Sequence, residues 1–205
     1  MSDVIIYGVP ASSYVRTARM SAAEKGVRHE LTPVEFGADS HRALHPFVKV
    51  PAMRHGDVTL YETIAISYYL DSTFEGGTKL FPTERMAHVR TLEYISVATS
   101  YLYPACISNI VLQYIFPKGE GGKPDTAVIE AAVPKAEQGL DVIEQALRGQ
   151  EWLAGPFSAA DLFVAAIAVS MMGTPEKRLL ETRPNVLGLI ERVGKRPAGE
   201  FLVPK

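Results

Sequence analysis

The chain has 205 residues, enough for one large domain or two small ones. Hydrophobic residues make up 47% and charged residues 21%, which is the balance of a globular protein with a core. The net charge of −2 gives no electrostatic reason to expect nucleic acid or an anionic membrane as a partner. The single cysteine, Cys106, excludes an internal disulfide, and we expect it to be a small buried residue rather than a nucleophile.

The sequence shows neither the pattern of a secretory signal nor that of a membrane helix. The N-terminus lacks a basic region followed by an apolar stretch, which is the pattern of a secretory signal. No uninterrupted apolar run approaches the roughly 20 residues that a membrane helix needs. We therefore expect a cytoplasmic protein with no membrane partner.

The N-terminal part of the chain alternates between strand and helix patterns. In chain order, we predict a strand at 3–7, a helix at 13–26, a strand at 27–34, a short helix near 40–45, a hairpin at 51–61 that turns at Gly56–Asp57, and a helix at 62–74. The order β-α-β-α-β-β-α predicts a mixed sheet with helices packed on it.

The rest of the chain has helical patterns. We expect a first domain at 1–75, a linker at 76–83 marked by Gly76, Gly77 and Pro82, and an all-helical domain at 84–205. The predicted helices are a long one at 84–116 kinked at Pro104, one at 126–148, a buried one at 157–172, a short one after Thr174, and a last one from Pro184 that ends before Pro197. Together the two parts predict an α+β fold.

Two features of the sequence have ordinary explanations. His41 and His45 have the spacing of two zinc ligands on a helix, but no further ligand is clearly placed to join them, so we predict no metal site. Ser158 and Asp161 have the spacing of a capping box at the start of the buried helix, which indicates a folding role.

Three other features each occur where a ligand can bind. The stretch YGVPASSYVR places hydroxyl groups where a strand turns into a helix, and Glu62–Thr63 opens another helix. Helix starts favour anions, because free N–H groups and the helix dipole both point there. Val50–Pro51 enters the hairpin, where the proline is either an ordinary trans residue at a strand edge or a cis-proline. A cis bond there leaves the Val50 main chain free to pair with an extended peptide-like ligand.

In this order the motifs YGVPASSYVRTARM, HPFVKVPAM, LYETIAISYYL and FSAADL resemble those of the cytosolic glutathione transferases, over roughly residues 3–196. The resemblance implies a thioredoxin-like N-terminal domain followed by an all-helical domain. It implies glutathione as co-substrate, with no other cofactor and no metal. Among the classes, the chain is similar to the serine types (phi, tau, zeta and theta). Tyr14 stands where zeta enzymes carry a cysteine, which disfavours a maleylacetoacetate isomerase.

The resemblance also implies roles for residues of the first domain. Val50 matches the residue whose backbone pairs with the cysteinyl part of glutathione, and Pro51 matches the family's cis-proline. Lys49 stands where a residue reaches the glycyl end, and Glu62–Thr63 matches the acidic-Ser pair that holds the γ-glutamyl group. The family's usual histidine or lysine before this loop has no clean match. Phe36 falls near one such position, and His41 is a weak candidate.

The resemblance assigns activation of the glutathione thiol to Ser12. A hydroxyl that donates to sulfur at a helix N-terminus favours the thiolate. Tyr7 is the competitor, because other classes use a tyrosine near the end of the first strand. We expect Ser13 to cap the helix and Tyr14 to face the electrophile. The electrophile is expected between the domains, against Val9, Pro10, Tyr14, Tyr101, Tyr103 and Ile107, although the tyrosines of the long helix are equally compatible with a core role.

The implied activity is conjugation of the glutathione thiolate to small hydrophobic electrophiles, as in detoxification. The alternatives are a glutathione-dependent peroxidase or disulfide reductase, which uses the same thiolate, and a non-catalytic binding protein of the same fold. We also expect a homodimer, formed between the N-terminal domain of one subunit and the helical domain of the other.

Overall fold

The computed structural model describes residues 4–204 and divides into two compact units, Met1–Phe81 with Gly194–Lys205, and Pro82–Val193. The first unit differs from the domain expected at 1–75 by including the last residues of the chain, which the sequence analysis assigned to the helical domain. Asp3, the first residue of the predicted first strand, lies outside the described residues.

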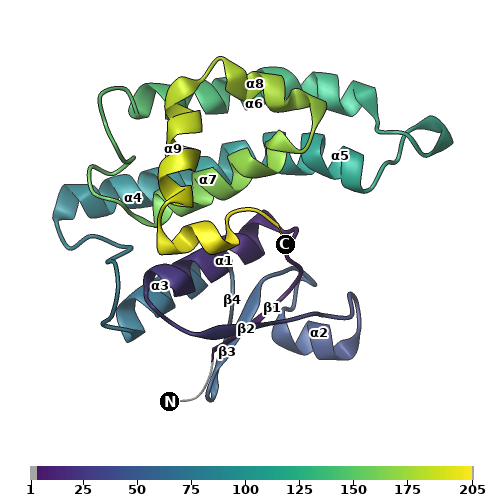
Figure 1. Cartoon of the computed structure of the whole chain (residues 1–205). Helices are drawn as coiled ribbons and strands as arrows, with labels where there is room; N and C mark the ends of the chain where they lie inside the picture. Colours follow the sequence, from purple (N-terminus) through teal and green to yellow (C-terminus); the bar gives the residue numbers. More distant parts are fainter. Residues whose placement is uncertain (1–3, 205) are drawn as a thin grey trace. The chain divides into compact units, whose positions relative to one another are not determined.

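The first unit contains a four-stranded mixed sheet with the strand order β2-β1-β3-β4. Its elements are β1 (Val4–Tyr7), α1 (Ser13–Glu24), β2 (His29–Thr32), α2 (Asp39–Leu44), β3 (Ala52–His55), β4 (Val58–Tyr61) and α3 (Thr63–Thr73), shown in Figure 1. β1 runs parallel to β2 and antiparallel to β3, and β3 runs antiparallel to β4. This is the predicted thioredoxin-like order of elements.

One face of the sheet packs against α1 and α3. The core there consists of apolar side chains from β1, α1, β3 and α3, namely Val4, Ile6, Val15, Ala18, Ala22, Met53, Ile66 and Leu70. The two helices lie side by side, and the hydroxyl of Ser21 in α1 donates to the hydroxyl of Ser67 in α3 at 2.9 Å. Alternate residues of each strand point to this face, which explains why Val4 and Ile6 are fully buried.

The C-terminal segment of the chain packs on α1 within the first unit. The sequence analysis did not predict the short 3-10 helix η4 (Pro197–Phe201), which lies beside α1 (Figure 1). The buried carboxylate of Glu24 accepts hydrogen bonds from Arg196 and from the Ala198 N–H, and Glu24 also forms an ion pair with Arg196 at 2.8 Å. These contacts explain why residues 194–205 belong to the first unit.

Most of the predicted linker, residues 76–81, also belongs to the first unit. The buried carboxylate of Asp71 accepts hydrogen bonds from the N–H groups of Leu80 and Phe81 at 2.8 and 3.1 Å. It also forms ion pairs with Lys25 and Lys79. Burial by itself raises the pKa of Asp71, but these hydrogen bonds outweigh it and hold the pKa below its usual value.

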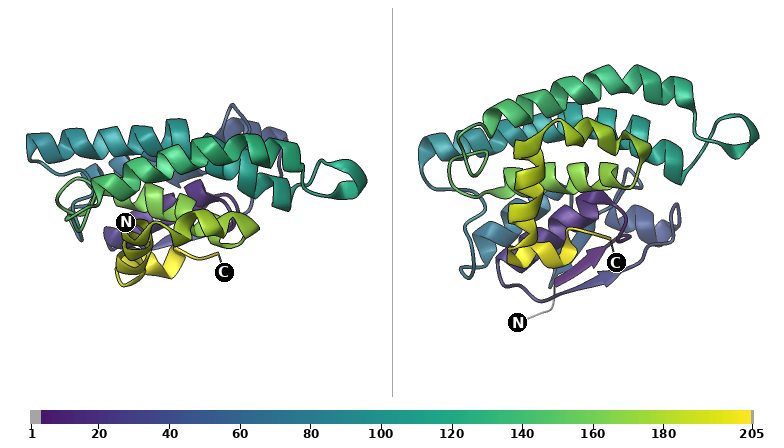
Figure 2. Two further views of the ribbon diagram at one scale, coloured as in Figure 1. Left: turned by 90° about the horizontal axis from the view of Figure 1, so that it is seen from above. Right: turned by 45° about the horizontal axis from the view of Figure 1, so that its top comes forward.

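The second unit is helical. Its elements are α4 (Arg85–Val97), η1 (Ala98–Val111), α5 (Leu112–Ile115), η2 (Glu120–Gly122), α6 (Thr126–Ala146), α7 (Ala159–Met172), η3 (Pro175–Lys177), α8 (Arg178–Glu181) and α9 (Pro184–Gly194), whose last residue belongs to the first unit. Figure 2 shows α6 running alongside the continuous helix of α4 and η1 in both views, and α6 packs against the η1 part. The buried helix α7 packs against α4 and η1.

The long predicted helix at 84–116 is continuous, but its middle part is a π-helix. Pro104 lies inside η1 and has no N–H to give, which removes one hydrogen bond of an α-helix. At the end of η1 the Leu112 N–H donates to the carbonyl of Ile107, five residues earlier. The sequence therefore predicted that the helix is disturbed at Pro104, but it predicted a kink where the structure has a π-helix.

By length and composition alone, the stretch Arg85–Ile115 is long and apolar enough to cross a membrane. Core helices of globular proteins have the same composition, and 44% of its most apolar window is buried inside the structure. Its η1 part packs against both α6 and α7. The interior of the helical unit therefore accounts for its apolar side chains.

The helix α7 begins with the predicted capping box. Asp161 accepts hydrogen bonds from the Ser158 N–H at 2.8 Å and from the Leu153 N–H at 3.0 Å, and it is fully buried. Burial raises the pKa of Asp161 to about 7, although these hydrogen bonds act in the opposite direction. Both partners lie in the second unit, so the role of Asp161 is structural.

Candidate functional site

The three segments singled out in the sequence meet at one edge of the sheet. In the strand register, Tyr7 of β1 is paired with Ala52 of β3, and Ala52 is paired with Tyr61 of β4. Because β1 and β4 both run antiparallel to β3, their carboxyl ends lie at the edge where β3 begins. The paired residues Tyr7, Ala52 and Tyr61 form a row across the sheet at this edge. The segment that contains Ser12 follows Tyr7, the Val50–Pro51 loop precedes Ala52, and Glu62–Thr63 follows Tyr61.

Gly8 brings the first of these segments against the second. A Cβ atom at Gly8 would lie 2.4 Å from Cγ2 of Val15 and 3.3 Å from Cβ of Val50. Only a residue without a side chain fits at this distance. Nothing in the sequence pattern distinguishes this glycine from an ordinary turn glycine, and its packing role emerges only when the two loops are brought together.

Both helices that pack on the sheet begin at this edge. α1 starts after β1 and α3 starts after β4, so the free N–H groups of their first turns face the same region. The N-cap residue of α3, Glu62, makes no side-chain hydrogen bond to the first turn. The first N–H groups of α3 are therefore not capped by that side chain, and an anion is favoured there.

The N-cap of α1 is Ser12, and the expectation that Ser13 caps this helix is wrong. The Ser12 carbonyl accepts the first intrahelical bond, from Arg16 at 3.0 Å, and the Ser12 hydroxyl accepts from the Val15 N–H at 3.4 Å. A serine hydroxyl that accepts a hydrogen bond still has its own proton to donate. Ser13 is instead the first residue of α1, and its buried hydroxyl oxygen has no partner among the described residues.

The hydroxyl of Tyr7, the competing candidate, is already bound. It accepts hydrogen bonds from two nitrogens of Arg54, from Nε at 3.0 Å and from Nη2. Tyr7 is buried, with 6% of its surface exposed. The sequence did not point to this contact, because Tyr7 and Arg54 are far apart in the chain and come together only through the β1–β3 register.

The Val50–Pro51 loop has the main-chain features that the resemblance implies. The Val50–Pro51 peptide bond is cis. Within residues 4–204, no group donates to or accepts from the main chain of Val50. The side chain of Lys49 is exposed, and its carbonyl is 2.9 Å from Nε2 of His41.

Glu62 has a backbone conformation that is uncommon for a residue with a side chain. Its φ of 71° lies in the left-handed region, and its side chain is exposed. Such conformations cluster at functional sites, where the surrounding structure maintains them. Thr63, the first residue of α3, is buried.

His41 and His45 have different environments. His41 is buried, its Nδ1 accepts from the Gly37 N–H at 3.4 Å, and its Nε2 then carries the proton that binds the Lys49 carbonyl. Both nitrogens therefore have main-chain partners, and His41 holds the loop rather than a ligand. Phe36 packs edge-on against His41 and is exposed. Within the described part of the chain, no three His, Cys, Asp or Glu side chains come together as a metal site.

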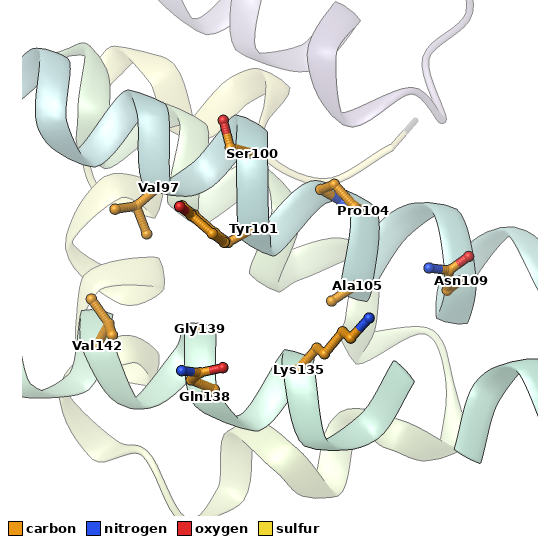
Figure 3. A pocket seen from close by; sticks show the side chains of 10 residues that line it. All are labelled: Val97, Ser100, Tyr101, Pro104, Ala105, Asn109, Lys135, Gln138, Gly139 and Val142. Atoms are coloured by element: carbon orange, nitrogen blue, oxygen red, sulfur yellow. The ribbon is translucent and has the colours of Figure 1, made fainter. Parts of the chain in front are cut away.

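The residues predicted for the electrophile lie in both units. Val9, Pro10 and Tyr14 of the first unit are partly buried. In the second unit, Tyr101 is exposed and lines a cavity of about 670 Å³ between η1 and α6. Figure 3 shows Tyr101 beside Val97 and Pro104 on one side of the cavity. The other side is formed by α6, with Lys135, Gln138 and Val142.

Tyr103 and Ile107 do not line that cavity. Tyr103 is half-buried, which raises its pKa, and Ile107 is buried. Cys106, next to Ile107, is buried as expected, and burial raises its pKa to about 12. A thiol with such a pKa remains protonated at neutral pH, so Cys106 is unsuited to act as a nucleophile.

Comparison with known proteins agrees with this arrangement. The glutathione S-transferase N-terminal domain family matches residues 6–78, and the glutathione S-transferase C-terminal domain family matches residues 126–192. Glutathione S-transferase 3 of Zea mays is 32% identical, with 97% of this chain and 92% of that protein covered.

Solved structures show the same similarity. Glutathione transferase F7 from Populus trichocarpa superposes with a TM-score of 0.88 at 29% identity, covering 97% of each chain. A theta-class glutathione S-transferase from Xanthomonas axonopodis pv. citri, solved with glutathione bound, has a TM-score of 0.87 at 25% identity and covers 100% of this chain and 99% of its own. The identity and coverage, together with the shared fold, show that this chain belongs to the glutathione S-transferase family.

Proposed function

We propose that this protein is a glutathione transferase that conjugates the glutathione thiolate to small hydrophobic electrophiles. The observation that carries the proposal is the meeting, at one sheet edge, of the starts of α1 and α3 and of the unpaired main chain of Val50. Such an edge offers donors for an anion and a partner for an extended peptide at the same time. Membership of the family supports the same reading.

Each part of glutathione has a proposed partner at this edge. The main chain of Val50, next to Pro51, pairs with the cysteinyl unit, and Lys49 binds the glycyl carboxylate. The carboxylate of Glu62 binds the γ-glutamyl ammonium, and Thr63 with the first N–H groups of α3 binds the γ-glutamyl carboxylate. These assignments pair opposite charges. The exposed carboxylate of Glu62 binds the ammonium group of the ligand, and the positive end of the α3 dipole binds the carboxylate of the ligand.

Ser12 is the proposed catalytic residue. A free thiol has a pKa near 8.5, so only a few per cent is ionised at neutral pH. The thiol proton leaves to water, and the Ser12 hydroxyl donates a hydrogen bond to the resulting thiolate while its oxygen accepts from the Val15 N–H. The start of α1 stabilises the same negative charge. The thiolate then attacks an electrophilic carbon, a carbon–sulfur bond forms, and the leaving group departs with the electron pair of its bond.

The remaining parts of the proposal concern the setting of the reaction. Glutathione is a co-substrate that is consumed, and the proposed reaction needs no further cofactor. The electrophile is proposed to bind the residues predicted from the sequence, namely Val9, Pro10, Tyr14, Tyr101, Tyr103 and Ile107. We further propose a cytoplasmic homodimer.

Two measurements on the same preparation test the proposed function. Retention on immobilised glutathione, eluted by free glutathione, tests binding, and release of halide from an activated aryl halide in the presence of glutathione tests conjugation. We expect both. Retention without turnover on aryl halides or hydroperoxides would favour a binding protein, whereas turnover on hydroperoxides alone would favour the peroxidase alternative. Absence of retention together with absence of turnover would contradict the proposal.

A further inference from the structure

His45 lies beside the proposed glutathione site, and one nitrogen of its buried ring lacks a hydrogen-bond partner in the described part of the chain. Only 2% of its surface is exposed, and its buried Nδ1 has no partner among the described residues. His41, one helical turn earlier, has main-chain partners on both nitrogens. Buried polar groups without partners are rare in native proteins, so one next to a candidate site needs a functional explanation.

The position of the ring is set by aromatic neighbours at the site. The His45 ring centroid is 4.9 Å from that of Tyr61 and 6.2 Å from that of Phe47. Tyr61 is the last residue of β4 and belongs to the row at the sheet edge, immediately before Glu62. The ring is thereby held close to the residue proposed to bind the ligand's ammonium.

The charges that face His45 come from each neighbouring segment. Burial lowers the pKa of His45 most, and the charges of His41 in α2 and Lys49 in the following loop lower it further. The carboxylate of Glu62, at the start of α3, acts in the opposite direction. The lowered pKa favours the neutral ring at neutral pH, and the ring becomes a cation only in more acidic solution. Among these groups Glu62 is the one carboxylate.

We infer that His45 is a positioning residue that determines whether the Glu62 carboxylate is available to the ammonium group of glutathione. This inference rests on the proposed function. When the ring is neutral, Glu62 can bind the ligand's ammonium. When the ring is protonated, the imidazolium attracts the same carboxylate and competes with the ligand, so acid weakens binding.

Glutathione itself does not titrate in the relevant range. Its α-carboxyl groups ionise near pH 3.5, its amine near pH 8 and its thiol near pH 8.5, by the ordinary values of these groups. Bound glutathione, however, is proposed to ionise at its thiol, which by itself makes affinity depend on pH. S-methylglutathione has no titratable thiol, so between pH 5 and 7.5 a change in its affinity reports on the protein. If binding excludes one proton, the dissociation constant rises by at most about tenfold for each pH unit below the pKa of the ring.

The test is calorimetric titration of the intact protein with S-methylglutathione at several values between pH 5 and 7.5. We expect the dissociation constant of the wild-type protein to rise as the pH falls through this range, by at most about tenfold for each pH unit. His45→Asn, which cannot be protonated, should show a flat profile. His29→Asn is the matched control, because His29 is also a histidine whose pKa is lowered by burial, and this variant should retain the slope of the wild type.

A second measurement does not depend on the folding of the His45 variant. The titration of the His45 ring, followed by NMR, should move to lower pH in Glu62→Gln, because that variant loses the charge that favours the imidazolium. A flat wild-type profile, a slope that persists in His45→Asn, or an unmoved titration in Glu62→Gln would each overturn the inference. Glutathione binding at pH 7.5 with any of these results leaves the proposed function standing, whereas no binding at any pH contradicts both.

Discussion

The hydroxyl of Tyr7 accepts hydrogen bonds from the guanidinium of Arg54 on the neighbouring strand. Strand pairing sets Arg54 opposite Ile5, two residues before Tyr7, so the two side chains extend along the same face of the sheet. An oxygen that already accepts two hydrogen bonds from a cation is engaged by the fold. The Tyr7 hydroxyl also keeps its own proton, but Arg54 holds it within the sheet, whereas the Ser12 hydroxyl lies at the start of α1. Because the free N–H groups there favour a thiolate, Ser12 is the better candidate for binding sulfur.

Replacement of Ser12 by alanine should lower turnover by about 10²-fold, because a hydroxyl that stabilises the thiolate is lost while the helix dipole remains. The pKa of bound glutathione, read from thiolate absorbance, should rise in Ser12→Ala. Tyr7→Phe is the matched control, since it removes one hydroxyl from the adjoining segment and should leave that pKa unchanged. The reverse pattern would assign the role to Tyr7.

Loss of the Glu62 carboxylate should weaken glutathione binding. A hydrogen bond to a charged group contributes about 1.5–3 kcal/mol, which corresponds to roughly one to two orders of magnitude in Kd. Calorimetry on Glu62→Ala measures this change. Asp57→Ala removes an exposed acid from the turn at the far end of the same hairpin and should bind as the wild type does. An unchanged Kd in a folded Glu62→Ala protein would remove Glu62 from the site.

Asp161→Ala should destabilise the fold and leave glutathione affinity unchanged. The variant loses an N-terminal cap, worth about 0.5–2 kcal/mol, and leaves the buried N–H groups of Leu153 and Ser158 unpaired, so we expect a loss of at least about 2 kcal/mol. Chemical denaturation measures it, with the exposed Glu130→Ala in α6 as control. Unchanged stability with lost binding would contradict the structural role.

The same carboxyl group predicts a pH dependence of stability. Because the pKa of Asp161 is raised to about 7 in the folded state, the folded protein binds more protons than the unfolded chain between about pH 4 and 7. Its contribution to the free energy of unfolding should therefore decrease as the pH rises through that range. The difference between wild-type and Asp161→Asn denaturation curves isolates this contribution, and a difference that increases with pH would show that the pKa is not raised.

The attachment of the C-terminal segment should depend on Glu24. Its carboxylate is fully buried and bound to Arg196, and removing one partner of a buried ion pair costs about 3–5 kcal/mol. Glu24→Ala should lower the free energy of unfolding by that amount. Glu93→Ala is the matched control, because Glu93 also pairs with an arginine, Arg90, but both side chains are about half exposed, and the cost should be under about 1 kcal/mol. Equal effects would contradict the assigned role.

The protein should form a homodimer in solution. Closed two-fold assemblies are the commonest oligomers, and the subunits are expected to meet between the N-terminal domain of one and the helical domain of the other. Sedimentation equilibrium at micromolar concentration should give twice the chain mass of 22.4 kDa. A single species at the chain mass would contradict this prediction.

Local patterns in the sequence were sufficient for most of the fold. The short run of β-branched residues in 4–7, the glycine stop after α1 and the turn at Gly56–Asp57 each act over a few residues, so their elements formed where predicted. The capping box at Ser158 and Asp161 is equally local and was confirmed. The segment 197–201 carries no periodic pattern, which is why η4 was missed.

The tertiary structure decided the features that depend on neighbours distant in the chain. Ser12 and Ser13 are equally good N-cap residues by type, and only the backbone path from Gly8, packed against Val50, determines that α1 is capped by Ser12. Likewise, no sequence pattern shows that Arg54 binds Tyr7 or that His45 lacks a partner. Hydrogen bonding acts over a few ångströms in space, whereas a sequence pattern reports only separation along the chain, so these contacts are defined by the sheet register and by loop packing.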